Sequence, residues 1–266
     1  MKPIFLFIVC FLIPLSTKAA TQPEEGWNFT VGTGALFAPS YFGDDEYQIS
    51  IVPNIQIKYE DKFFASTQEG VGYNALKNEN WRIGPILRYD FGRDEDGEGP
   101  FQITSGNNDL VGLGDVDGTV ELGGFVEYKF RPFSAKLEIR QGVGGHDGLI
   151  GQTGLSYSGR GMISDRPFFY SLGPEIVFAG ENYHESYFNV NAAQAIASGL
   201  SAYDADGGLL SYNFGGTMIM PLTENISAVF LASYNRLGEE SADSSLVDER
   251  GSPNQFTTGA FINYSF

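Results

Sequence analysis

The chain has 266 residues with 33 acidic and 16 basic side chains, a formal net charge of −17 that excludes a nucleic-acid-binding protein, since phosphate backbones attract cations. It contains 34 Gly, 22 Phe and 14 Tyr, yet only 42% of its residues are hydrophobic. Glycine and aromatic enrichment without long apolar runs is typical of a membrane β-barrel, whose strands need apolar residues only at alternate positions. A soluble β-sandwich is the alternative that composition leaves open.

The N-terminal segment has the pattern of a secretory signal peptide. Lys2 precedes an apolar run from Ile4 to Leu15, and small or polar residues follow from Ser16 to Ala20. Because a membrane-spanning helix needs roughly 20 apolar residues, we expect residues 1–20 to be a signal peptide cleaved near Ala19 or Ala20, rather than a retained anchor. Residues 21–266 would then form one exported domain without cysteine, with 14 basic and 33 acidic residues and a net charge of −19.

Segments along the mature chain alternate between apolar and polar residues, which predicts strands with one lipid-facing and one inward face. The alternation is weak in the segments 63–73, 183–191 and 225–236. The predicted strands are 27–37, 47–59, 63–73, 80–91, 117–130, 133–142, 149–159, 167–178, 183–191, 207–220, 225–236 and 254–266. The predicted fold class is therefore all-β, a closed antiparallel transmembrane barrel of about 12 strands, with ten or fourteen also compatible with the pattern.

The inward parity of these strands carries charges of both signs. The predicted lumen charge network comprises Lys58, Arg82, Arg88, Glu121, Glu127, Lys129, Lys136, Glu138, Arg140 and Glu175, and Glu60 and Asp90 share its parity. Balanced charges favour a cross-paired, partly filled interior over a pore that selects one ion sign. About twelve strands also make a narrower barrel than the roughly 16 to 18 strands of open porins.

The turn Arg131-Pro132 predicts the register of the strands on either side of it. A two-residue turn between Phe130 and Phe133 places Glu127 opposite Lys136. By the same register, Phe125 lies opposite Glu138 and Gly123 opposite Arg140.

The last strand predicts the direction of every other strand. Phe266, Tyr264 and Ile262 alternate at the end of the chain and resemble the C-terminal insertion signal of bacterial outer-membrane barrels, whose last strand runs toward the periplasm. Counting backward predicts that 238–253, 192–206 and 131–132 are extracellular, and that 221–224, 179–182, 142–148 and 92–116 are periplasmic. The long segment 92–116 breaks the rule that periplasmic turns are short. Either one strand is miscounted, or this segment docks a periplasmic enzyme or folds inward as a plug.

The connections between strands are acidic and predict solvated loops. They include Asp44 to Glu46, Asp94 to Glu98, Asp204 with Asp206, and Glu239 to Arg250. The strings 115–118 and 204–207 lack the spaced ligands of a calcium loop and predict turns.

The sequence assigns no catalytic, cofactor-binding or metal-binding residue. His146 and His184 are its only histidines, and without a mature cysteine it does not predict a structural zinc site. His184 and Ser186 would share a face in a strand, as in a lipid-hydrolysing barrel enzyme, but no orienting Asn follows at the required position. We therefore expect a protein that is not an enzyme and needs no cofactor.

Several strings resemble the MipA/OmpV family of outer-membrane proteins (MltA-interacting protein-like) over essentially the whole mature chain. They are Gly34 to Gly43, Gly112 to Tyr128, Arg140 to His146 with Arg140, Gly144, Gly145 and His146, Tyr183 to Phe188, Ser198 to Gly208, and Gly251 to Phe256. The resemblance implies the outer membrane of a Gram-negative bacterium, contact with its lipid and insertion machinery, and no established catalytic residues. In some members it implies a scaffold that links a lytic murein transglycosylase to a murein synthase, and in others a porin-like or adhesive antigen.

Three functions follow for testing. A non-enzymatic scaffold for murein (peptidoglycan) enzymes rests on the resemblance. A passive pore for small polar solutes rests on the inward charges, and single-channel conductance separates it from the scaffold. A lipid-hydrolysing enzyme is the third.

Overall fold

The computed structural model describes residues 26–96 and 108–266, so the predicted signal peptide and part of the acidic run from Asp94 to Glu98 lie outside the described residues. The strands are β1 (Trp27–Pro39), β2 (Tyr47–Tyr59), β3 (Phe63–Ser66), β4 (Gly70–Tyr73), β5 (Leu76–Lys77), β6 (Trp81–Asp90), β7 (Thr119–Phe130), β8 (Phe133–Val143), β9 (Leu149–Ile163), β10 (Arg166–Ala179), β11 (Gly208–Pro221), β12 (Ile226–Leu237) and β13 (Asn254–Ser265). The helices are α1 (Glu181–Phe188), α2 (Ala192–Ser198), α3 (Glu239–Ala242) and α4 (Ser245–Arg250). No helix in these two ranges is long and apolar enough to cross a membrane.

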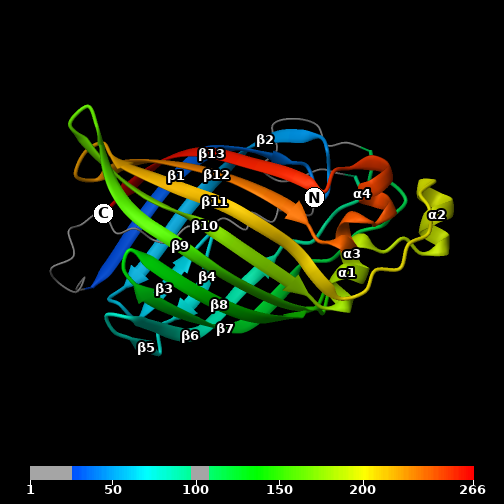
Figure 1. The fold of residues 1–266 in the computed structure, drawn as a ribbon, viewed down its shortest axis with the longest axis horizontal. Coiled ribbons are helices and arrows are strands. Elements are labelled where there is room, and N and C mark those ends of the chain that lie inside the picture. The colour runs from blue at the N-terminus through cyan, green and yellow to red at the C-terminus, as the bar shows by residue number, and fades with distance from the viewer. Residues whose placement is uncertain (1–25, 97–107) are drawn as a thin grey trace.

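The strands form one antiparallel sheet that closes on itself (Figure 1). The first and last strands pair, with Thr30 opposite Ser265, and β4 pairs with β6, with Val71 opposite Leu87. Because β4 and the two-residue β5 both pair with β6, they act as one interrupted strand, and the barrel has 12 strands around its wall. The predicted fold class is confirmed.

The alternating sequence produces an apolar outer surface. Along β1, for example, Phe29, Val31 and Phe37 are exposed, whereas Leu36 and Ala38 are buried inside. Outward-facing aromatic residues gather in two belts, as in outer-membrane barrels that meet lipid headgroups on both sides. One belt contains Trp27, Tyr59, Trp81, Tyr128, Phe130, Phe133, Tyr157 and Tyr170, and the other contains Phe37, Tyr47, Tyr89, Phe178, Tyr212 and Phe256.

The predicted count of strands is correct because two errors cancel. The segment 63–73 is a hairpin of β3 and β4, turned where the Glu69 amide donates to the Ser66 hydroxyl and Gly70 adopts a φ of 82°. The segment 183–191 is not a strand, since helix α1 occupies 181–188. Tertiary packing decides this, because α1 buries Tyr183, His184, Tyr187 and Phe188 on one helical face.

The corrected count also reverses the predicted topology upstream of α1. The connections 40–46, 180–207 and 238–253 and the described residues 91–96 and 108–118 all lie at one end. There Arg250 donates to the Asp109 carbonyl at 2.7 Å and Arg93 donates to the Tyr187 carbonyl at 2.6 Å. The prediction that 92–116 and 142–148 lie at the other end of the barrel from 238–253 is therefore wrong. It is also wrong that 179–182 and 192–206 lie at different ends, and that 131–132 and 221–224 lie at different ends. Each error follows from counting one strand too many.

The barrel thus has two different ends (Figure 1). We call the one with the long connections the loop end and the other, with the turns 60–62, 131–132, 164–165 and 222–225, the turn end. Outer-membrane barrels have short periplasmic turns and longer extracellular loops. By this rule we expect the turn end to face the periplasm, and the long segment 92–116 no longer breaks the rule.

The register predicted for the β7–β8 hairpin is confirmed. Glu127 pairs with Lys136, and Gly123 pairs with Arg140. Phe125 pairs with Glu138 and is 2% exposed, so this parity faces inward. The hairpin positions most of the charged side chains described below.

The long connections are not simple solvated loops but fold into a cap. The cap consists of α1 to α4 with the described parts of the four long connections. Within Glu239 to Arg250, which we predicted to be a solvated connector, Leu246 and Val247 are 1% and 0% exposed. Asp44 is likewise 0% exposed. Apolar residues spaced for short helices, rather than the charge between them, decide the structure here.

Candidate functional site

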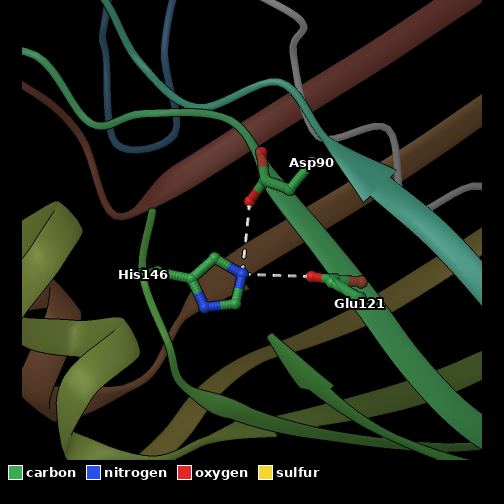
Figure 2. Close-up of side chains that lie close together, drawn as sticks. All are labelled: Asp90, Glu121 and His146. Atoms are coloured by element: carbon green, nitrogen blue, oxygen red, sulfur yellow. Dashed lines mark hydrogen bonds and ion pairs between the residues drawn. The ribbon is translucent and has the colours of Figure 1, made fainter. Parts of the chain in front are cut away.

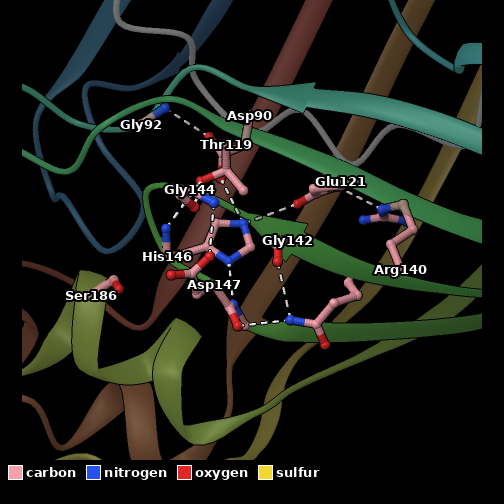
Figure 3. A network of polar contacts seen from close by, with 12 residues as sticks. Asp90, Gly92, Thr119, Glu121, Arg140, Gly142, Gly144, His146, Asp147 and Ser186 are labelled. Atoms are coloured by element: carbon pink, nitrogen blue, oxygen red, sulfur yellow. Dashed lines mark hydrogen bonds and ion pairs between the residues drawn. The ribbon is translucent and has the colours of Figure 1, made fainter.

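Charged side chains meet on the inner face of the wall formed by β6 to β9, beneath the cap (Figure 3). Glu121 is 1% exposed, Glu138 is 0% exposed and Arg140 is 1% exposed. Charges this deeply buried are stable only when they are paired and hydrogen-bonded. We call the group the inner network, and its members are Arg88, Asp90, Glu121, Lys136, Glu138, Arg140, His146 and Gln152.

Arg140 lies at the centre of the inner network. Its Nε donates to Glu121 Oε2 at 2.7 Å, and its Nη1 donates to Gln152 Oε1 at 2.9 Å and to Glu138. Residue 123, directly opposite, is glycine, and a Cβ there would lie 2.0 Å from the Ile139 carbonyl oxygen and 2.9 Å from Arg140 Cγ. Charge-assisted bonds from three directions hold the guanidinium in one place.

Glu138 carries the network across to neighbouring cations. Arg88 Nε lies 2.9 Å from Glu138 Oε1, and Lys136 Nζ lies 2.8 Å from Glu138 Oε2. Together with Arg140, three cations surround this one carboxylate. The side chains come from β6 and β8, and β7 between them contributes Glu121, so the network braces three adjacent strands.

His146 connects the network to the loop end through a tight turn between β8 and β9. Gly144 and Gly145 adopt φ angles of 81° and 52°, which favour glycine. The His146 amide donates to the Thr119 hydroxyl at 3.0 Å, and the Gly148 amide donates to His146 Nδ1 at 2.9 Å. These bonds direct the opposite nitrogen, Nε2, into the barrel.

His146 Nε2 faces two carboxylates (Figure 2). It lies 3.3 Å from Glu121 Oε1 and 3.7 Å from Asp90 Oδ2. Ligand atoms of the three residues lie within 4.8 Å of one another, a spacing that could hold a metal ion. This cluster joins residues far apart in the sequence, and their spacing did not predict it.

The hydrogen bonds of the cluster nevertheless fit a proton better than a metal. Because Nδ1 accepts from the Gly148 amide, the ring proton is on Nε2 and donates toward Glu121. A metal on Nε2 would move that proton to Nδ1, where it would face the Gly148 N–H, whereas metal-bound histidines donate from their other nitrogen. Asp90 Oδ2 also accepts from the Tyr187 hydroxyl at 2.8 Å. The cluster is a closed hydrogen-bond network.

Asp90 links the inner network to helix α1, and Arg93 holds that helix within the cap. The Tyr187 hydroxyl on α1 donates to Asp90, and Arg93 donates to the Tyr187 carbonyl. Burial, and then the nearby Asp90, raise the pKa of Tyr187 well above its ordinary value, so its hydroxyl stays protonated as a donor. Helix α1 is therefore attached to the barrel wall through the Tyr187 hydroxyl, and to the connection after β6 through the Tyr187 carbonyl.

Two apolar clusters hold the cap on the barrel mouth. In the first, inward residues of the wall pack against loop residues: Ile150, Val177, Ala179, Leu210 and Leu237 against Tyr183, Tyr187, Phe188, Ala205 and Val247. The second lies within the cap and contains Tyr41, Leu110, Leu113, Val190, Leu200 and Leu246. The Ser244 hydroxyl adds a bond to the Phe188 carbonyl at 2.6 Å. The cap is seated in the mouth by apolar burial from every long connection.

The remaining predicted charges form a second group nearer the turn end. Arg82 lies 3.5 Å from Glu127 and 3.4 Å from Glu69, with its guanidinium between the rings of Phe64 and Phe125. Lys129 Nζ is 3.7 Å from Glu127. Elsewhere, Glu175 accepts from Asn213 at 3.2 Å, and Lys58 lies opposite Phe64 in the register of β2 and β3.

The structure thus divides the predicted network into parts. Arg88, Glu121, Lys136, Glu138 and Arg140 come together, and Arg82, Glu127 and Lys129 form the second group. Glu175, on β10, interacts electrostatically with Arg88, Lys136 and Glu138 of the inner network, and Lys58 is on β2. Among the residues of the family string, Arg140 and His146 both contact Glu121, while Gly144 and Gly145 shape the turn. A functional role for these residues remains a prediction.

His184 and Ser186 do not form a catalytic pair. Both are on α1, where the Ser186 hydroxyl donates to the Asn182 carbonyl at 2.7 Å and His184 Nδ1 lies 3.3 Å from the Gly180 carbonyl. Residues two apart on a helix point in different directions, unlike residues two apart on a strand. The sequence suggested this pair only because the segment was read as a strand.

The geometry defines the class of protein: an outer-membrane-type β-barrel with a folded cap at its mouth. The family profile described as "MltA-interacting protein MipA" matches residues 31–266, and the chain belongs to that family. It is 27% identical to "Outer membrane protein OmpV" of Vibrio cholerae serotype O1, over 100% of both chains. It is 26% identical to "Outer membrane protein Omp26La" of Vibrio anguillarum, again over 100% of both. The protein is thus an outer-membrane protein.

Solved barrels resemble the chain only distantly. Pseudomonas putida OprB matches with a TM-score of 0.38 and 13% identity, covering 83% of this chain and 59% of that one. The outer-membrane protein OmpT of Vibrio cholerae matches with a TM-score of 0.36 and 7% identity, covering 90% and 98%. These similarities are too low to bear on function.

Proposed function

We propose that this protein is a non-enzymatic structural component of the outer membrane, whose turn end holds murein-processing enzymes on the periplasmic side. The observation that carries the proposal is the filled barrel mouth. Apolar side chains from the wall and the cap pack there, and the charges beneath them are 0–1% exposed at Glu121, Glu138 and Arg140. A passive pore needs a water-lined route, and these side chains do not line one.

The nature of the partner follows from the family description, which names an interaction with MltA. We therefore take a lytic murein transglycosylase as the first partner and a murein synthase as the second. Both would meet the barrel at the turn end, because the cap occupies the opposite end. The turn end thus replaces the segment 92–116, for which the sequence pattern predicted a periplasmic docking site as one of two alternatives.

Two measurements test the proposal with the mature wild-type protein. In planar bilayers we expect no stable single-channel conductance, and a reproducible conductance would favour the pore. In detergent, the purified barrel should retain a purified MltA-type transglycosylase, while an unrelated outer-membrane barrel of similar size should not. Lipid composition should stay unchanged on overexpression, since a lipid-hydrolysing enzyme would alter it.

A further inference from the structure

The hairpin of β9 and β10 extends past its neighbour at the turn end. Pairing between β8 and β9 ends at Phe133 opposite Tyr157, after which the Ser158 amide donates to the Pro132 carbonyl at 2.8 Å. The β9–β10 ladder continues to Ile163 opposite Arg166. Residues 159–163 therefore extend about 16 Å past the end of β8, at roughly 3.3 Å per residue. Figure 1 shows this light-green hairpin at the turn end, beside the orange β11–β12 turn.

One edge of this projection has unpaired backbone groups. In an antiparallel strand, the N–H and C=O of one residue point to the same side, and the side alternates along the chain. Since Ser158 points toward β8, Arg160 and Met162 point the same way, where the described chain has no further strand. Such an edge is a template for another strand.

The projecting hairpin is well formed without a neighbour on its β9 side, while β11 flanks its β10 side. The ring of Phe168 covers Gly161 and the ring of Tyr170 covers Gly159, so closely that an added Cβ would lie 2.4 Å and 2.5 Å from the respective ring. Cross-strand aromatic cover of this kind stabilises glycine positions in sheets. Ser164 and Asp165 have φ angles of 45° and 66°, as a two-residue hairpin turn requires. The edge is therefore presented in a fixed, extended shape.

Two exposed arginines lie along the edge, and one carboxylate, Asp165, lies at the hairpin tip. Arg131, at the corner where the edge begins, and Arg160, on the edge itself, are both exposed. Within residues 26–96 and 108–266, neither guanidinium forms an ion pair with a carboxylate. An extended segment bearing acidic side chains would complement both the backbone groups and the charge.

We propose that the free edge of β9 binds an extended, acidic segment of the MltA-type transglycosylase as an added strand. This inference rests on the proposed function and specifies its contact surface. Main-chain bonds to Arg160 and Met162 would supply affinity, and the two arginines would select acidic side chains. Lipid phosphates at the periplasmic interface could use the same arginines, but they would not use the backbone edge.

A matched pair of variants separates the edge from its side chains. Met162→Pro removes the N–H that points away from β10 and leaves the β9–β10 ladder intact, since proline is tolerated on an edge. Met162→Ser changes the side chain but keeps the N–H. With the full mature barrel in detergent and the purified transglycosylase, we expect Met162→Pro to weaken binding at least about tenfold. Met162→Ser should bind like the wild type, and both should show wild-type heat modifiability on gels.

The outcomes distinguish the possibilities. Equal binding by wild type and Met162→Pro would overturn the edge proposal while leaving the scaffold in place. If wild type does not bind the transglycosylase, both proposals fail. If Arg160→Glu abolishes binding but Met162→Pro does not, the surface recognises charge alone and strand addition is wrong. A photo-crosslinker at residue 162 that captures only lipid in native envelopes would also overturn it.

Discussion

Replacing Arg140 by methionine should destabilise the barrel strongly. The substitution roughly keeps the volume of the side chain but removes its bonds to Glu121, Glu138 and Gln152. Among the residues that the structure describes, Glu138 retains Arg88 and Lys136, whereas Glu121 retains only His146. Breaking a buried ion pair from one side costs about 3–5 kcal/mol, because the remaining charge is uncompensated.

Urea unfolding in vesicles measures this loss of unfolding free energy. The fluorescence of Trp27 and Trp81, which lie in the aromatic belt at the turn end, reports when the strands leave the lipid. The double variant Arg140→Met with Glu121→Gln should recover part of the loss, because the stranded charge is gone. Lys129→Met is a matched control: its side chain is 34% exposed and 3.7 Å from Glu127, so we expect less than about 1 kcal/mol. If the free energy of unfolding of Arg140→Met is within about 1 kcal/mol of the wild-type value, the inner network does not stabilise the barrel wall.

Two further predictions concern the cap and the orientation. Burial lowers the pKa of His184 from its ordinary value. Because the unfolded cap therefore binds more protons than the folded cap, the cap should have its full stability above about pH 6.5 and lose stability as the pH falls from there toward the lowered pKa. Proteolysis of the cap should therefore be faster near pH 5 than above pH 6.5 in the wild type, but not in His184→Leu. Equal rates of proteolysis of the wild type under these two conditions would contradict this prediction. An epitope tag after Gly199 should be labelled on intact cells and one at Arg131 only after permeabilisation; the reverse pattern would invert the assigned orientation.

The barrel wall could be predicted from the sequence because each strand faces two different solvents. Alternation at 27–37 and 117–130 identifies inward and outward positions without knowledge of the neighbours. The Arg131-Pro132 turn then fixes the pairs between β7 and β8. What alternation cannot do is count short or atypical elements, as the hairpin within 63–73 demonstrates.

Helix α1 was missed although its sequence carries a signal. Tyr183, His184, Tyr187 and Phe188 follow a helical spacing, which becomes evident once a buried face is assumed. The cluster of Asp90, Glu121 and His146 is different, because it depends on β6, β7 and a turn meeting in space. Only inward parity pointed to Asp90 and Glu121, and nothing in the spacing pointed to His146 as their partner.

The wall and the cap are held by different interactions, and this shapes what the protein can do. The wall is closed by a continuous ladder of backbone bonds, from β1–β13 around to β4–β6, whereas apolar clusters and a few bonds such as Tyr187 to Asp90 hold the cap. Elements held by fewer bonds open at lower cost than the global structure. The cap can therefore loosen while the wall stays intact. A conducting state of this barrel would require such loosening. If conductance appears only at acid pH and is lost in His184→Leu, the pore belongs to a form in which the cap has opened, and not to the capped form.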